Sequence, residues 1–104
     1  MKGIKMTVYL IAEIKVTDDK WVPDYAANVH SLVEKHGGWK LHGSYFSVIG
    51  RLNTVVDVWE IPDANAVQTT LEIASQDPEF QKWIPVIEEC VEDETLQLMT
   101  KLPV

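Results

Sequence analysis

The order in which two hydrophobic periodicities follow one another along the chain constrains its fold most strongly. Four segments have the alternating or β-branched and aromatic pattern of strands: residues 6–16, 39–49, 53–61 and 94–102. Two segments, residues 22–36 and 77–91, repeat apolar residues every three or four positions, as amphipathic helices do. A further short helix is expected between residues 63 and 75. This order, β-α-β-β-α-β, predicts an α+β, ferredoxin-like fold with a four-stranded antiparallel sheet.

Residues that start and stop helices support these boundaries in the first half of the chain. Thr17, Asp18 and Asp19 are suited to the start of the first helix, because their side chains accept hydrogen bonds from free backbone N–H groups. Gly37 and Gly38 predict its end, since glycine adopts the left-handed conformation of a helix C-terminus without strain.

The second half has equally clear boundaries. Pro62 is expected to stop the third strand, and Asp63 to cap the short helix that follows. Residues 77–79, Asp-Pro-Glu, predict another helix start, with a carboxylate near the positive end of the helix dipole. Pro85 lies too far inside that helix to be accommodated, so we expect a kink or a break there.

Composition bounds the functional class. The 104 residues suit one domain, residues 1–104, with the hydrophobic (46%) and charged (24%) fractions of a globular protein. A formal net charge of −7 argues against nucleic acids and anionic membrane surfaces as partners. The single cysteine, Cys90, and the absence of a recognisable signal peptide or membrane span favour a cytoplasmic location. No metal or cofactor is expected, because no His and carboxylate set has ligand spacing.

The two faces of the predicted sheet differ in polarity. The more apolar face is expected to meet the helices: Val8, Leu10, Ala12, Ile14, Val56, Val58, Leu96 and Leu98. The opposite face then carries Tyr9, Ile11, Glu13, Asn53, Val55, Asp57, Trp59, Gln97 and Met99. This second face is too apolar to lie in water and too polar for a plain core. It predicts a homodimer in which two sheets close a barrel around a shared pocket for a small hydrophobic metabolite.

The second strand is placed by its turn. If Gly50 and Arg51 form a two-residue loop, Phe46, Ser44 and His42 lie opposite residues 55, 57 and 59 of the third strand. Residues directly opposite share a face, so all three would point into the barrel. A three-residue loop would turn His42 outward instead.

Three segments between residues 40 and 84 resemble the NIPSNAP family, within the dimeric α+β barrel superfamily. They read KLHG, GRLNTVVDVWE and SQDPEFQKW, and the matching residues are Gly50, Asn53, Val55, Val56, Trp59, Asp77, Pro78 and Phe80. The first half, with Tyr25 and the KHGG of residues 35–38, is similar to a neighbouring group of such barrels. The superfamily includes cofactor-independent monooxygenases, polyketide cyclases, isomerases and dehydratases. The position of Asp57 often holds histidine in NIPSNAP proteins, so no inherited role is assigned to it.

Asp57 and His42 are the candidate catalytic residues. A carboxylate flanked by valines in mid-strand must be paired or solvated, and partial burial would suit it to general-base chemistry. His42 would shuttle protons beside it; each residue would otherwise be an ordinary hydrogen-bonded strand residue. His30 lies off the apolar stripe of the first helix and is expected in solvent, and His36 is expected at that helix's C-terminus.

The remaining candidates would bind substrate. Tyr9 and Trp59 would form walls, and polar contacts would come from Glu13, Ser44, Asn53 and Gln97. The favoured hypothesis is a cofactor-independent enzyme, of cyclase, isomerase, dehydratase or monooxygenase type, acting on a polyketide-like or aromatic metabolite. The alternatives are a non-catalytic carrier using the same pocket and a barrel packed solid with side chains.

Overall fold

The computed structural model describes residues 7–17 and 20–102 and confirms the α+β, ferredoxin-like fold with a four-stranded antiparallel sheet. Its elements in chain order are β1 (Val8–Val16), α1 (Val22–Gly37), β2 (Lys40–Phe46), β3 (Thr54–Ile61), α2 (Ala66–Ala74), α3 (Pro78–Gln81), α4 (Ile84–Cys90) and β4 (Val91–Thr100). The strand order is β2-β3-β1-β4, so β1 and β3 are central and β2 and β4 form the edges.

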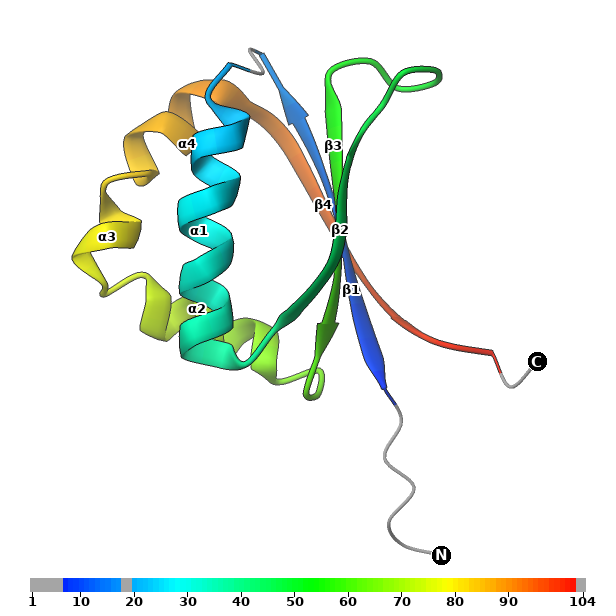
Figure 1. Ribbon diagram of the computed structural model, residues 1–104, viewed down its shortest axis with the longest axis vertical. Coiled ribbons are helices and arrows are strands. Elements are labelled where there is room, and N and C mark those ends of the chain that lie inside the picture. Colours follow the sequence, from blue (N-terminus) through cyan, green and yellow to red (C-terminus); the bar gives the residue numbers. More distant parts are fainter. Residues whose placement is uncertain (1–6, 18–19, 103–104) are drawn as a thin grey trace, which may run out of the picture.

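All the helices cover one face of the sheet, and no described element covers the other face (Figure 1). Beneath the helices, one core cluster is centred on Trp59, with Leu10, Val33, Trp39 and Ile61. A second cluster comprises Ala12, Ile14, Val16 and Val55. The core therefore lies between the layers, with β1 supplying every second residue to it, as the alternating pattern predicts.

The helix boundaries follow the predicted residues. The backbone of Gly38 is left-handed (φ 66°) and its N–H donates to Glu34 O at 3.0 Å, which ends α1. The Asp63 carboxylate accepts from the N–H groups of Asn65 and Ala66 at 2.8 and 3.1 Å, before α2. The predicted break at Pro85 is confirmed, because α3 ends at Gln81 and this proline lies in the first turn of α4. The start of α1 differs: its N-cap residue is Trp21, with no side-chain cap, and the predicted Thr17 instead donates from Oγ1 to Cys90 O at 3.4 Å. Asp18 and Asp19, also predicted to start α1, lie outside the described residues.

Gly37 lets α1 end against α2. A Cβ atom at this position would overlap the side chain of Thr70 and lie 2.7 Å from Trp39 Nε1. Thr70 is buried and its Oγ1 accepts a hydrogen bond from Trp39 Nε1 at 3.1 Å, so neither side chain is free to withdraw.

Gly37→Ala is therefore expected to lower the free energy of unfolding by about 1–3 kcal/mol, the usual cost of overpacking a fixed site. Urea denaturation measures it. Gly38→Asn is the matched control: a Cβ there meets nothing within 4 Å, and asparagine adopts the strained left-handed conformation more readily than other side chains do, so we expect a smaller loss. Equal stability of the two variants would contradict the close packing at Gly37.

The predicted orientation of β3 is wrong. Leu10 pairs with Trp59, and Ala12 with Asp57, so these β3 side chains share the helix-covered face with β1's core residues. Val56 and Val58, predicted to meet the helices, lie on the uncovered face opposite Glu13 and Ile11. The physical reason is that both faces of this strand are largely apolar, and pairing with a distant strand decides which one faces the helices.

The connection between β2 and β3 is longer than the predicted two-residue loop. Strand β2 ends at Phe46 and β3 begins at Thr54. In the turn between them, Asn53 takes a left-handed conformation (φ 55°). The pairs Phe46–Val55 and Ser44–Asp57 are nevertheless those predicted. Beyond them a bulge shifts the register, so Leu41 and not His42 lies opposite Trp59.

None of the helices in residues 7–17 and 20–102 is long and apolar enough to cross a membrane.

Candidate functional site

A cavity of about 480 Å³ lies between the helices and the sheet. Its walls are mostly apolar and aromatic, and they include Trp39 and Trp59 from the sheet side and Phe80, Ile84 and Ile87 from α3 and α4. A volume of this size suits a small organic molecule. The sequence interpretation expected any pocket to need walls from a second chain, but this cavity is formed within one chain.

Asp57 is the polar centre of this cavity. Its side chain is only 7% exposed, and it is held from two directions. Ser44 Oγ, on the neighbouring strand β2, donates a hydrogen bond to Asp57 Oδ1. His30 Nε2, from α1 on the other layer, lies 3.2 Å from Asp57 Oδ2. A buried carboxylate is tolerated here because both oxygens have partners.

His30 is oriented by its neighbours. Its ring packs edge-on against Trp59, with ring centroids 4.9 Å apart, and its side chain is 12% exposed. When Asp57 is ionised, His30 Nε2 must donate to it, which leaves a lone pair on Nδ1 in the neutral ring. Nδ1 has no hydrogen-bond partner within the described part of the chain. This is the arrangement of a general base held in one tautomer by a carboxylate.

Tyr25 and Glu94 are two further polar residues in the cavity walls. Burial, followed by the negative charges of Glu94 and Asp57, raises the pKa of the Tyr25 hydroxyl far above its ordinary value. Tyr25 therefore remains a neutral hydrogen-bond donor at physiological pH. Burial and the charge of Asp57 also raise the pKa of Glu94, which lies on the edge strand β4. The cavity walls thus contain three acidic side chains, Asp57, Glu88 and Glu94, and one imidazole, that of His30.

Comparison with known proteins shows which family the chain belongs to. A family model described as NIPSNAP matches residues 5–104. The chain belongs to the NIPSNAP family. No relative was found among the curated proteins.

Solved structures of other NIPSNAP proteins have the same fold. An uncharacterized NIPSNAP domain protein from Burkholderia xenovorans is 20% identical, with a TM-score of 0.74 over 92% of this chain and 95% of its own. A NIPSNAP protein of unknown function from Agrobacterium tumefaciens is 21% identical, with a TM-score of 0.75 over 95% of this chain and 91% of its own. Another from the same species is 14% identical, with a TM-score of 0.77 over 99% of this chain and 92% of its own.

Asp57, Ser44 and Trp59 are brought together in this NIPSNAP chain, but not where the sequence placed them. They were predicted inside a barrel formed by the uncovered faces of two sheets, and they lie instead on the helix-covered face. A buried aspartate could not have been assigned to that face from the strand pattern alone, because its partners Ser44 and His30 come from other elements.

His42 does not join them. It is 39% exposed on the bulge in β2, where Nε2 lies 3.0 Å from Glu60 Oε1. Its ring packs edge-on against Tyr9, with centroids 5.6 Å apart. Tyr9 and Glu60 are paired across β1 and β3 on the uncovered face. The sequence prediction that His42 lies opposite Trp59 and beside Asp57 is therefore wrong, and the cause is the bulge.

The other predicted contacts also lie away from the cavity. Glu13 faces the uncovered side and its Oε1 lies 3.5 Å from Arg51 Nη1. Gln97 pairs with Ile11 on that same side. Asn53 is in the β2–β3 turn, where its carbonyl accepts a hydrogen bond from Val16 N at 2.8 Å. None of these three belongs to the cavity walls, so any role in binding requires a site on the uncovered face.

His30 is the residue that sequence reasoning missed, since it was expected in solvent. A signal was present: it lies four residues after Ala26 and three before Val33, so it borders the apolar stripe of α1. No three His, Cys, Asp or Glu side chains gather to hold a metal ion within residues 7–17 and 20–102.

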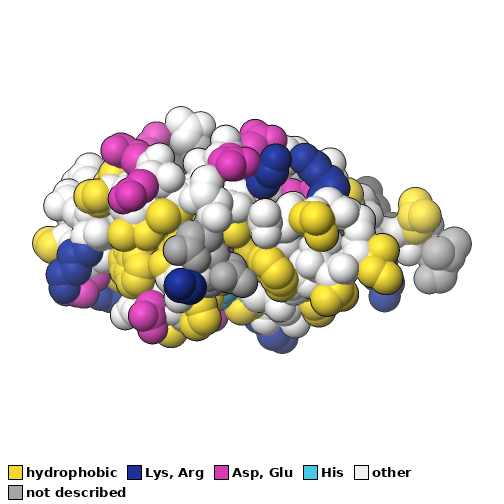
Figure 2. All heavy atoms as spheres, turned by 90° about the horizontal axis from the view of Figure 1, so that it is seen from above, with side chains coloured by type: hydrophobic (Ala, Val, Ile, Leu, Met, Phe, Trp, Pro, Cys, Tyr) yellow, Lys and Arg dark blue, Asp and Glu magenta, His cyan; other side chains and the backbone are white. Residues whose placement is uncertain are grey.

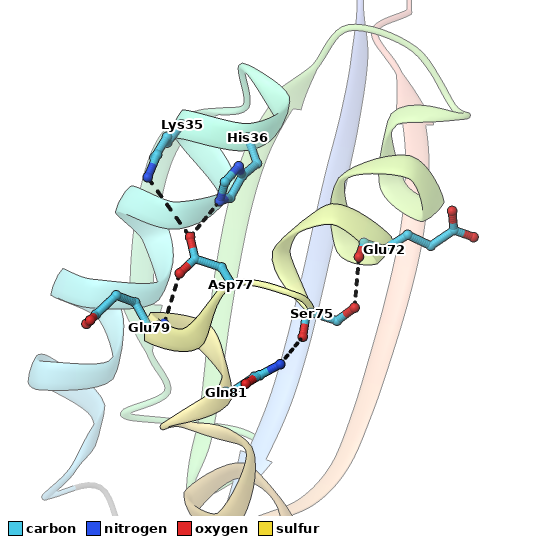
Figure 3. A network of polar contacts seen from close by, with 7 residues as sticks. All are labelled: Lys35, His36, Glu72, Ser75, Asp77, Glu79 and Gln81. Carbon is cyan, nitrogen blue, oxygen red and sulfur yellow. Dashed lines mark hydrogen bonds and ion pairs between the residues drawn. The ribbon is translucent and has the colours of Figure 1, made fainter.

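A second polar cluster ties the cavity's helical wall to α1 (Figure 3). Asp77 caps α3 by accepting from Glu79 N at 2.9 Å, and its Oδ2 lies 2.8 Å from His36 Nε2 and 4.0 Å from Lys35 Nζ. The hydrogen bond with His36, then that with the Glu79 N–H, lowers the pKa of Asp77. The segment that follows Asp77 carries Phe80 into the cavity wall.

This pKa shift predicts a pH dependence. A carboxyl whose pKa is lower in the folded state contributes stability above its unfolded pKa, about 3.9, and loses it as the pH falls through the folded value. Asp77→Asn keeps a helix-capping side chain but removes the charge. We expect its Tm to lie below that of the wild type from pH 7 down to about pH 4, and to converge with it only as the pH falls through the lowered pKa of Asp77. In thermal scans carried down to about pH 2, a difference in Tm that stays constant over the whole range would contradict the role of the charge.

Proposed function

We propose that this NIPSNAP protein is a small cofactor-independent enzyme that transfers protons on a hydrophobic, carbonyl-bearing metabolite bound between the helices and the sheet. The observation that carries the proposal is the His30–Asp57 pair in the wall of an apolar cavity. Perturbed or paired titratable groups inside an apolar pocket are typical of sites that do acid–base chemistry.

The chemistry needs only groups that the cavity has. His30 Nδ1 accepts a proton from a carbon next to the carbonyl, and the C–H electron pair becomes that of an enolate. Tyr25 donates a hydrogen bond to the enolate oxygen, because its raised pKa keeps the hydroxyl protonated. Return of the proton to another carbon is an isomerisation. Attack of the enolate carbon on a second carbonyl of the same molecule is a cyclisation, in which the carbonyl π electrons pass to that oxygen and it takes the proton from His30. Asp57 stabilises the imidazolium that forms in between.

Deuterium exchange tests this proposal without knowledge of the natural substrate. β-Tetralone is an apolar bicyclic ketone with acidic protons next to its carbonyl. Incubated with the protein in D₂O and followed by NMR, it is expected to exchange these protons faster than in buffer alone. Binding of β-tetralone, measured by calorimetry, without accelerated exchange would favour a carrier protein. If β-tetralone neither bound to the protein nor exchanged its protons faster than in buffer, the result would count against the cavity as the site.

We also propose that the protein is a homodimer formed through the uncovered face of the sheet. That face carries Ile11, Val56, Val58 and the 46%-exposed Met99 at its centre and β4 side. The end of the molecule that carries the β2–β3 hairpin also exposes apolar side chains among charged ones (Figure 2), including Val48 and Ile49, which are 88% and 93% exposed. Apolar surface of this extent is typical of interfaces.

Ile11→Arg tests the dimer without touching the cavity. The wild type is expected to have twice the chain mass of 11.8 kDa by light scattering, and the variant the chain mass itself. A charge placed in the middle of an apolar interface is left unpaired and costs most of the association energy. A wild-type protein that remains monomeric at tens of micromolar would contradict the proposal.

A further inference from the structure

Two exposed carboxylates belong to the walls of the cavity. Glu88 on α4 and Glu94 on β4 both belong to its walls, and both are exposed, unlike Asp57 deeper inside. No lysine or arginine lies among the described residues that line it. A molecule bound in this cavity therefore has two exposed acidic groups in the same walls as the aromatic side chains.

These two glutamates are free to meet a ligand. Neither forms a hydrogen bond or an ion pair within residues 7–17 and 20–102. Other acidic residues nearby are already engaged, such as Glu92, whose Oε2 lies 3.3 Å from Lys15 Nζ. Burial, followed by repulsion from the charge of Asp57, raises the pKa of Glu94. A positive charge on a ligand beside Glu94 would offset this repulsion.

The inner part of the cavity suits the rest of such a ligand. Trp39, Trp59, Tyr25 and Phe80 provide aromatic surface, which packs against apolar rings and attracts cations at ring faces. A carboxylate, phosphate or acyl-phosphate ligand would meet three acidic side chains, Asp57, Glu88 and Glu94, and no lysine or arginine among the described lining residues could pair with it.

We propose that the ligand of this cavity is an apolar molecule bearing a protonated amine, with the amine at the side of Glu88 and Glu94 and the apolar body against Trp59 and Phe80. This inference rests on the proposed function, which places the ligand in this cavity. It adds that the ligand carries a positive charge. Acidic metabolites are excluded from the site by the same carboxylates.

Three probes of one shape test the charge preference: naphthylethylamine, naphthylethanol and naphthylacetate, titrated by calorimetry at pH 7. The amine is expected to bind about ten-fold or more tightly than the acid, with the alcohol between them, and raised salt should narrow the difference. Glu88→Gln and Glu94→Gln are each expected to weaken amine binding by about two- to five-fold and leave the alcohol unchanged. Glu89→Gln is the matched control, since Glu89 is on the same helix but outside the cavity wall.

Three outcomes would overturn the inference. Naphthylacetate could bind as tightly as the amine, or no probe could bind at all. Glu89→Gln and Glu94→Gln could also weaken amine binding equally. These outcomes are separate from failure of the proposed function. Amine preference with no deuterium exchange on β-tetralone would leave the ligand class standing and remove the enzyme. Accelerated exchange on β-tetralone without a preference for the amine probe would leave the enzyme proposal standing and remove the proposed ligand class.

Discussion

Replacing His30 by glutamine is expected to slow deuterium exchange on β-tetralone by about 10²–10⁴-fold, the usual contribution of a positioned general base. Glutamine can still donate a hydrogen bond to Asp57, so the carboxylate keeps a partner and the fold is retained. It cannot accept a proton from carbon. Ligand affinity, measured by calorimetry, is expected to change far less than the exchange rate.

His42→Gln is the matched control for this prediction. His42 was the sequence-based candidate, but the structure places it on the uncovered face beside Tyr9 and Glu60. Its replacement should leave the exchange rate within about two-fold of the wild type, because it touches no described wall of the cavity. If His42→Gln abolished exchange and His30→Gln did not, the catalytic role assigned to the His30–Asp57 pair would be wrong.

Trp59→Ala is expected to have the largest effect on stability, lowering the free energy of unfolding by about 3–5 kcal/mol. Trp59 is 4% exposed and packs edge-on against both Trp39 and His30, so alanine leaves a hole that these rings cannot fill. Such a loss is a large share of the roughly 5–15 kcal/mol that stabilises a typical domain.

Urea denaturation measures this loss, with Leu52→Ala as the control. Leu52 is 67% exposed in the β2–β3 connection and is expected to contribute within about 0.5 kcal/mol. A loss below about 1.5 kcal/mol for Trp59→Ala would indicate that this side chain does not lie in the core beneath the helices.

The element order and most boundaries were predictable because the chain carries explicit local signals. Gly38 in its left-handed conformation, Asp63 and Asp77 as caps, and Pro85 at a helix break each act within a few residues of their own position. Sequence reasoning needs no knowledge of distant contacts at such sites. The same applies to β1, whose alternation matches its burial.

The orientation of β3 was not predictable from the strand itself. Asp57 made one face look polar, and Val56 and Val58 made the other look like core. The structure buries the aspartate because Ser44 and His30 satisfy it from two other elements. A buried polar residue is assigned correctly only when its partners are known, and these partners lie 13 and 27 residues away.

The site was half predictable. Asp57, Ser44 and Trp59 were selected correctly as neighbours, since the Ser44–Asp57 pairing follows from the hairpin register. The position of His42 was predicted wrongly because of the bulge in β2, which a hydrophobic pattern does not reveal. The cavity itself was missed because it depends on how far α3 and α4 stand from the sheet, which no local signal specifies.

A crystal structure of the protein soaked with β-tetralone tests the central claim most directly. We predict density for the ketone between the helices and the sheet, with a carbon next to its carbonyl near His30 Nδ1 and the oxygen within hydrogen-bond distance of the Tyr25 hydroxyl. Density on the uncovered face, beside His42 and Tyr9, with the inner cavity filled by side chains, would contradict the claim that His30 and Asp57 form the functional site.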